Sequence, residues 1–71
     1  MPTVTGPELR RERREAEVPV TVIARRMQLS RQTIHTLERD AEPSPERVTA
    51  YRQALAAEVA VKVAARQDDA A

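Results

Sequence analysis

Residues 46–66 contain neither glycine nor proline, and this uninterrupted run is the feature that most restricts what the chain can fold into. Apolar residues recur in it at spacings of three or four, as on one face of an α-helix: Val48, Tyr51, Leu55, Val59 and Val63. We therefore predict one long helix, or two in close succession. An alternative stays open, because Val59, Val61 and Val63 also alternate as in a strand, which could pair with a partner chain.

The chain has 71 residues and no cysteine, which predicts one small domain without disulfides or thiolate metal sites. Hydrophobic residues (41%) and charged residues (32%) are balanced as in a folded helical domain. With one histidine, one glycine and serine only at positions 30 and 44, we expect no enzyme, no metal and no cofactor. No stretch is long and apolar enough to cross a membrane, and the absence of cysteine favours a reducing, cytoplasmic setting.

Local signals place three helices before the long one. Thr5 and Pro7 mark the start of a first helix, whose apolar stripe is thin and whose broad charged face is rich in arginine. Pro19 favours a helix start over a strand for the apolar residues that follow it. Ser30 and Ser44 are suitable caps for the later helices. The predicted ranges are 7–17, 20–27 and 30–38, and the last two flank a tight turn.

The net charge of +1 hides a local positive field. Residues 18–37 hold Arg25, Arg26 and Arg31 and no acidic residue, whereas two aspartates stand near the end of the chain. The first helix adds a run of arginines, which either forms a solvated face or includes weaker phosphate contacts at Arg10 and Arg14.

Residues 18–39 resemble the helix-turn-helix of the Cro and phage-repressor (XRE) family. Five positions match the family's pattern: the small Ala24, the apolar turn residue Leu29, the cap Ser30, and the core anchors Ile34 and Leu37. The resemblance extends over residues 8–56. It implies an all-α, lambda-repressor-like bundle of four to five helices with a long or split C-terminal helix.

A DNA major groove about 12 Å wide admits one α-helix, which in this family is the second helix of the motif. Arg31 can make a bidentate contact to guanine, and Gln32 can do the same to adenine. Thr36 can reach a base edge or a thymine methyl, and all three match the family's base-reading positions. The expected phosphate contacts come from Arg25, Arg26, Ser30, His35 and Arg39. Each of these residues could instead be an ordinary exposed polar residue.

The resemblance also implies a structural ion pair. Arg13 and Glu38 match a partly buried pair that links the first helix to the end of the recognition helix in related repressors, although two unrelated surface charges would give the same sequence. Gln28 departs from the pattern, because it stands at a turn position usually held by glycine and would need a left-handed conformation. Val20 and Val22 are apolar on a normally polar face, which predicts a small patch that is covered by N-terminal residues or offered to a protein.

We expect four segments: a flexible start (1–6), a DNA-binding domain (7–56), a helical extension (57–66) and a disordered tail (67–71). The extension could mediate dimerisation, helix to helix or strand to strand. Candidate dimer contacts are Leu55, Val59, Val61 and Val63.

The expected function is sequence-specific binding of double-stranded DNA, by a transcriptional repressor that acts as a homodimer on a palindromic operator in a bacterial cell or phage-infected host. Phage regulators, antitoxins and small autoregulators all share this pattern. The alternative is an antitoxin-like or other interaction module, in which the same scaffold binds a protein partner.

Overall fold

The computed structural model describes the backbone of residues 3–70 and the side chains of residues 3–66. This part of the chain is all-helical and contains no strand, which confirms the predicted all-α class. Its four helices are α1 (Gly6–Glu15), α2 (Val20–Met27), α3 (Arg31–Leu37) and α4 (Pro45–Ala70).

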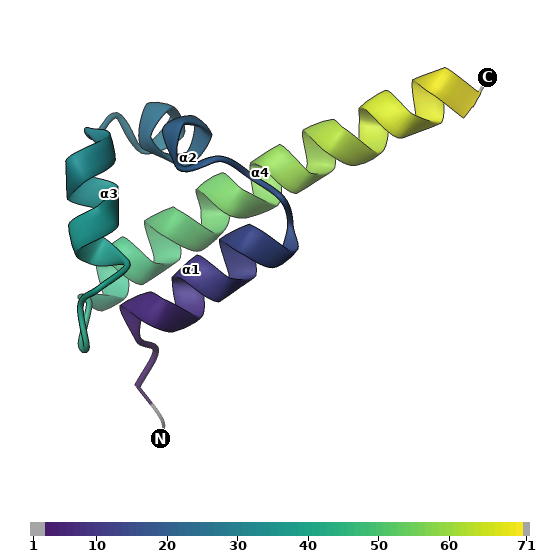
Figure 1. Cartoon of the computed structure of the whole chain (residues 1–71). Coiled ribbons are helices and arrows are strands. Elements are labelled where there is room, and N and C mark those ends of the chain that lie inside the picture. Colours follow the sequence, from purple (N-terminus) through teal and green to yellow (C-terminus); the bar gives the residue numbers. More distant parts are fainter. Residues whose placement is uncertain (1–2, 71) are drawn as a thin grey trace.

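Helix α4 forms the long axis of the molecule (Figure 1). It has 26 residues, which corresponds to about 39 Å at 1.5 Å per residue, and the molecule is 43 Å long in its largest dimension. Helix α1 lies alongside the first half of α4, and α2 packs on both α4 and α3. The last turns of α4 project beyond the other helices, so this part of the helix is left uncovered (Figure 1).

The predicted caps are in place at three helix starts. Each is a hydroxyl oxygen that accepts a hydrogen bond from the backbone amide three residues further on, and so satisfies a donor that the helix itself leaves free. The capping residues and their distances are Thr5 (3.3 Å), Ser30 (3.1 Å) and Ser44 (3.2 Å).

Helices α1 and α2 end with the same backbone motif. Gln28 follows α2 with φ 58° and ψ 41°, the left-handed conformation that its place in the turn predicts. Its amide donates to the Arg25 carbonyl oxygen (3.2 Å), and the next amide donates to Ala24 (2.9 Å). Glu17 has the same φ after α1, so that helix ends two residues before the predicted position 17. Both sites use a residue other than glycine where glycine is favoured.

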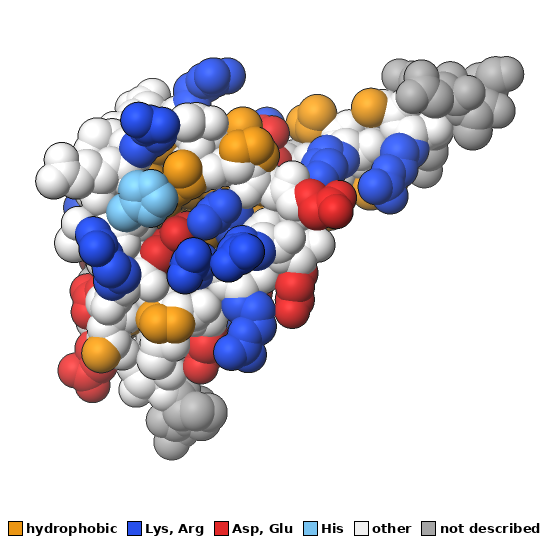
Figure 2. All heavy atoms as spheres, in the orientation of Figure 1, with side chains coloured by type: hydrophobic (Ala, Val, Ile, Leu, Met, Phe, Trp, Pro, Cys, Tyr) orange, Lys and Arg blue, Asp and Glu red, His pale blue; other side chains and the backbone are white. Residues whose placement is uncertain are grey.

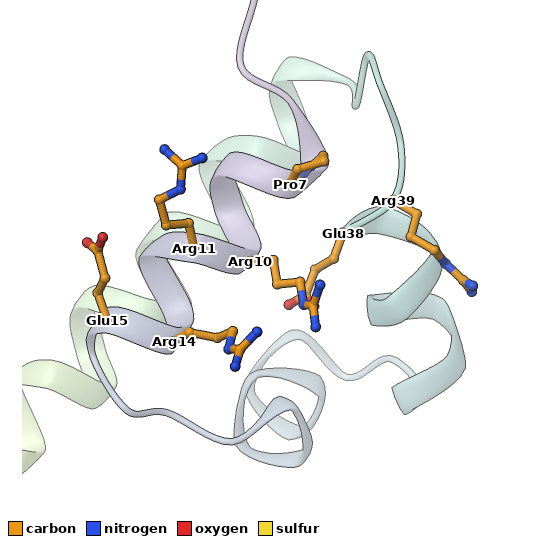
Figure 3. Close-up of a pocket in the computed structure, with 7 residues that line it drawn as sticks. All are labelled: Pro7, Arg10, Arg11, Arg14, Glu15, Glu38 and Arg39. Atoms are coloured by element: carbon orange, nitrogen blue, oxygen red, sulfur yellow. The ribbon is translucent and has the colours of Figure 1, made fainter.

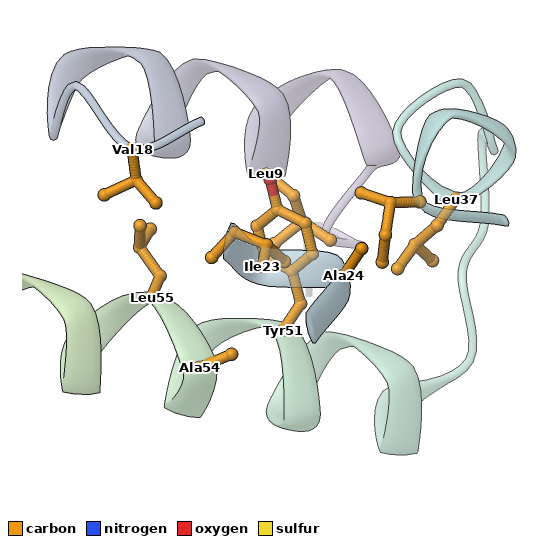
Figure 4. Packing of buried hydrophobic residues seen from close by; sticks show 9 residues of the cluster. Leu9, Val18, Ile23, Ala24, Leu37, Tyr51, Ala54 and Leu55 are labelled. Atoms are coloured by element: carbon orange, nitrogen blue, oxygen red, sulfur yellow. The ribbon is translucent and has the colours of Figure 1, made fainter. Parts of the chain in front are cut away.

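Side chains from all four helices meet in one core (Figure 4). Tyr51 of α4 is fully buried in it, as its place in the apolar stripe predicts. Val20 and Val22 are half-buried and pack against this core, so the apolar patch predicted for them is largely covered. The core consists of Leu9, Val18, Ile23, Ala24, Ile34, Leu37, Tyr51, Ala54 and Leu55.

The predicted dimer contacts do not share one surface. Leu55 is buried in the core and points towards Val18, so the prediction that it faces a partner was wrong (Figure 4). Val59, Val61 and Val63 are exposed and helical, which excludes the extended alternative for this segment. On a helix, Val61 lies about 200° around the axis from Val59, whereas Val63 lies close to Val59's face.

Both ends of the described chain are more regular than predicted. Val4 packs partly against the core and Gly6 begins α1, so the segment predicted to be flexible is structured from here on; residues 1–2 lie outside the described residues. Helix α4 continues through residues 67–70, where a disordered tail was predicted, and residue 71 lies outside the described range. No glycine or proline interrupts the helix in that stretch, nor at the predicted boundary between residues 56 and 57.

Gly6 lies at a close contact between α1 and the end of α3. Its amide donates to the Asp40 carbonyl oxygen at 2.7 Å. A Cβ atom at this position would lie 2.2 Å from the Leu37 carbonyl oxygen and 2.7 Å from the Glu38 carbonyl carbon. Only glycine therefore fits, and the reason is space rather than backbone conformation.

Candidate nucleic-acid interface

Arg13 and Glu38 form a two-pronged ion pair between α1 and the residue that ends α3. Arg13 Nε donates to Glu38 Oε2 at 2.7 Å, and Nη2 donates to Oε1 at 3.1 Å. A third donor, Nη1, reaches the Val18 carbonyl oxygen at 3.0 Å. The side chain of Glu38 is only 2% exposed and that of Arg13 only 12%. The pair implied by the resemblance is thus present, and it is an interior contact rather than a chance meeting of surface charges.

Tyr51 completes this cluster from α4, a role that its place in the apolar stripe did not indicate. Its hydroxyl donates to Glu38 Oε2 at 2.6 Å. One carboxylate therefore links α1, the end of α3 and α4. Among the described residues, no buried side-chain nitrogen or oxygen lacks a partner.

The cluster determines which groups are charged. Burial alone would raise the pKa of Glu38, but hydrogen bonds from Arg13 and Tyr51, with the positive charge of Arg13, hold that pKa below its usual value. For Tyr51, burial and the neighbouring carboxylate raise the pKa of the phenol. The hydrogen bond to Glu38 likewise raises the pKa of Arg13. The stable state is a carboxylate held by a guanidinium and a neutral phenol.

This arrangement leaves one face of α3 free. Ile34 and Leu37 point into the core, whereas the side chains on the opposite face are exposed. The three predicted base-reading residues lie on that exposed face together with His35: Arg31, Gln32 and Thr36. The Thr36 hydroxyl donates to the Gln32 carbonyl oxygen at 3.0 Å, so its methyl group is the freer end of the side chain.

A concave surface runs between α1 and α3. It brings together Arg31, Gln32, His35 and Arg39 of the predicted site and sets them beside α1. Figure 2 shows basic side chains gathered on this face of the molecule. The residues that line the surface are Arg10, Arg13, Arg31, Gln32, His35, Glu38 and Arg39. We call it the α1–α3 groove.

Two predicted phosphate ligands on α2 lie elsewhere. Arg26 forms an ion pair with Glu58 of α4, which turns it towards the body of the protein and away from the groove. Its charge is offset within the fold, so the phosphate contact predicted for Arg26 on α2 would have to compete with Glu58. Arg25 is exposed but does not line the groove. Ser30 is occupied as a cap and bonds to the Thr33 hydroxyl at 2.8 Å.

A second hollow adjoins the groove and extends it along α1 (Figure 3). Glu38, Arg10 and Arg39 line both hollows, so the two surfaces are continuous. The remaining lining residues come from α1: Pro7, Arg11, Arg14 and Glu15. The sequence indicated this second hollow only through the run of arginines in the first helix, where Arg10 and Arg14 were predicted to be weaker phosphate contacts.

Lys62 makes a further contact that the sequence did not predict. Its ammonium group donates to the carbonyl oxygens of Ala16 (2.8 Å) and Glu17 (3.2 Å), at the carboxyl end of α1. A cation is favourable there because the last carbonyls of a helix carry partial negative charge. This contact and the Arg26–Glu58 pair both fasten α4 to the rest of the bundle.

Within residues 3–70, no group of three or more histidine, cysteine or acidic side chains is arranged to hold a metal ion. No helix in the same range is long and apolar enough to span a membrane. Comparison with protein-family models, curated proteins and solved structures finds no match for this chain.

Proposed function

We propose that the chain is a sequence-specific double-stranded DNA-binding regulator of the helix-turn-helix type, and that α3 is its recognition helix. The observation that carries this proposal is the exposed face of α3. Arg31, Gln32 and Thr36 project from it, while the buried side of the same helix is anchored in the core. These side chains suit guanine, adenine and thymine edges in the major groove.

The buried cluster supports the same proposal. A reading helix must keep a fixed orientation, since base contacts depend on geometry. Glu38 stands directly after α3 and is held by Arg13 and Tyr51 from two other helices. The cluster would give α3 the fixed orientation that base reading requires.

We further propose that two copies bind a palindromic operator and repress transcription by occupying a promoter. A two-fold dimer would place its α3 helices in half-sites about 34–36 Å apart. The exposed Val59 and Val63 of α4 are the candidate dimer contacts that remain on one helix face.

Those exposed valines also favour a second candidate, an antitoxin-like module that binds a protein through α4. The two proposals differ in their response to salt. Affinity for DNA falls steeply with salt as counterions are released, with a slope of about 0.9 per neutralised phosphate. An apolar protein interface responds little.

The test is selection of bound sequences from a random duplex library, followed by titration of the enriched duplex at several salt concentrations and by measurement of the mass of the complex. We expect a palindromic motif, two chains per duplex and a steep salt slope. Failure to enrich any sequence would refute sequence-specific recognition, and one chain per duplex would refute the dimer.

A further inference from the structure

Helix α1 carries arginine charge that the fold does not neutralise. Arg10 and Arg14 are one turn apart, are exposed, and make no hydrogen bond or ion pair with another described side chain. Like charges at this spacing on a helix repel each other. Two neighbouring acids are engaged elsewhere, since Glu12 pairs with Arg52 and Glu38 pairs with Arg13. A third, Glu15, lines the hollow with Arg14 but extends from the same side of α1 as Arg11 (Figure 3).

The side chains of Arg10 and Arg14 extend from the same side of α1. Figure 3 shows Arg10 and Arg14 extending from α1 towards the end of α3, whereas Arg11 extends from the other side of the helix. Arg10 lines both hollows, and Arg14 lines the one beyond the groove. Arg39, after α3, lines both as well. The basic surface therefore continues from the exposed face of α3 onto α1.

We propose that Arg10 and Arg14 form a phosphate-binding strip, which holds the backbone of the DNA strand that borders the major groove entered by α3. The inference rests on the proposed function, because it takes duplex DNA as the ligand. The strip would bind phosphate oxygens without reading bases, and would fix the direction in which α3 lies along the duplex.

Continuity and charge favour DNA over a small anion. The hollow that holds the strip is open and shares Arg10, Glu38 and Arg39 with the α1–α3 groove. Because Arg31 and Gln32 line that groove, a ligand on both surfaces must be long and carry regularly spaced negative charge. A DNA duplex meets both conditions, with one negative charge per about 1.7 Å of its axis. Side chains four residues apart lie about 6 Å from each other, which allows two separate phosphate contacts.

The test is a salt titration of the double variant Arg10→Gln/Arg14→Gln against wild type, on both a selected duplex and a random one. Arg66→Gln is the single-charge control, to be compared with the effect per charge in the double variant, because Arg66 is an exposed arginine of α4 that lines neither hollow. Thermal unfolding followed by circular dichroism checks that all three proteins fold.

If the strip binds phosphate, the double variant loses about 1.8 from the slope of log affinity against log salt. Its affinity falls roughly 60-fold at 0.1 M salt for both duplexes, which is about 8-fold per lost contact. The preference for the selected sequence is kept, and Arg66→Gln behaves as wild type.

Other outcomes separate this inference from the proposed function. An unchanged slope in the double variant, together with sequence preference in the wild type, overturns the strip and leaves the proposed function standing. A reduced slope in a protein that shows no sequence preference supports the strip and refutes specific reading. A slope loss in Arg66→Gln equal to half that of the double variant overturns the strip, since the effect per charge would then be one of net charge alone. Binding of no duplex overturns both proposals.

Discussion

The hydroxyl of Tyr51 lies 2.6 Å from Glu38 Oε2 and donates a hydrogen bond to the carboxylate that also binds Arg13. A residue near the start of α4 thereby helps to hold the end of α3, across the loop that joins the two helices. The contact is buried, so its loss leaves part of a carboxylate without a partner and away from water.

Tyr51→Phe tests this contact. The ring stays in the core and only the hydroxyl is removed, so the free energy of unfolding should fall by about 1.5–3 kcal/mol, the usual range for a hydrogen bond to a charged group. Urea denaturation measures the change. A variant as stable as wild type would mean that the hydroxyl contributes nothing.

Breaking the buried ion pair should cost more than breaking an exposed one. Arg13→Met leaves Glu38 buried without its cation, for which we expect a loss of about 3–5 kcal/mol. The exposed pair between Glu12 and Arg52 supplies the control, because both side chains are more than a third exposed. Glu12→Gln should cost less than about 1 kcal/mol. Equal losses in the two variants would contradict the buried role.

The cluster also predicts two limits on stability with pH. Glu38 has a lowered pKa in the folded protein, so its contribution is present above the ordinary value of 4.5 and is lost as the pH falls through the lower folded pKa. The stability difference between wild type and Glu38→Gln should therefore narrow in acid.

Tyr51 has a raised pKa, so its contribution to stability is present below 10.0 and is lost as the pH rises through the higher folded pKa. Urea denaturation at a series of pH values measures the free energy of unfolding and would reveal both limits. If the difference in this free energy between wild type and Glu38→Gln stayed constant in acid, Glu38 would not be ionised in the folded protein.

Gln28→Gly should stabilise the protein. Gln28 is held at φ 58°, a left-handed conformation that is unfavourable for every residue with a Cβ atom and is readily adopted by glycine. We expect a gain of about 0.5–1 kcal/mol. The same substitution at Gln53, an exposed position inside α4, should instead cost about 1 kcal/mol, since glycine weakens a helix interior. Thermal denaturation of both variants would show opposite shifts in Tm, and shifts of the same sign would rule out relief of backbone strain.

Arg31→Ala and Gln32→Ala should reduce discrimination between duplexes. Each bidentate base contact contributes about 1–3 kcal/mol of preference over a wrong base, so each variant should lose roughly 5- to 150-fold in the ratio of selected to random affinity. Competition binding at fixed salt measures this ratio. If both affinities fell equally, Arg31 and Gln32 would be phosphate ligands rather than readers.

Much of the fold was predictable because its signals are local. The helix starts are marked by hydroxyl caps and by Pro7 and Pro19, which act within a few residues of each end. The observed helices therefore begin close to the predicted positions. The run without glycine or proline predicted most of the length of α4 in the same local way. The left-handed turn at Gln28 was also predicted, but only because the resemblance places this residue where glycine is usual. The equivalent conformation at Glu17 was not, since glutamate has no preference for it.

The errors arose where tertiary packing decides. Leu55 and Val59 lie on the same stripe of α4, yet α1 and α2 cover only the earlier part, and the sequence does not state where that cover ends. Arg26 was indistinguishable from Arg25 until its pairing with Glu58, 32 residues away, became visible. Tyr51 gave a correct prediction of burial but no sign of its hydrogen-bond partner.

The single glycine of the chain has one more consequence. Because no side chain stands between Gly6 and the Leu37 carbonyl oxygen, the distance between α1 and the end of α3 is set by a missing methyl group. A bulkier residue would have to push the end of α3 outwards and would alter the width of the α1–α3 groove without replacing any residue that lines it. Position 6 therefore sets the spacing of the two basic surfaces, although it lines neither of them.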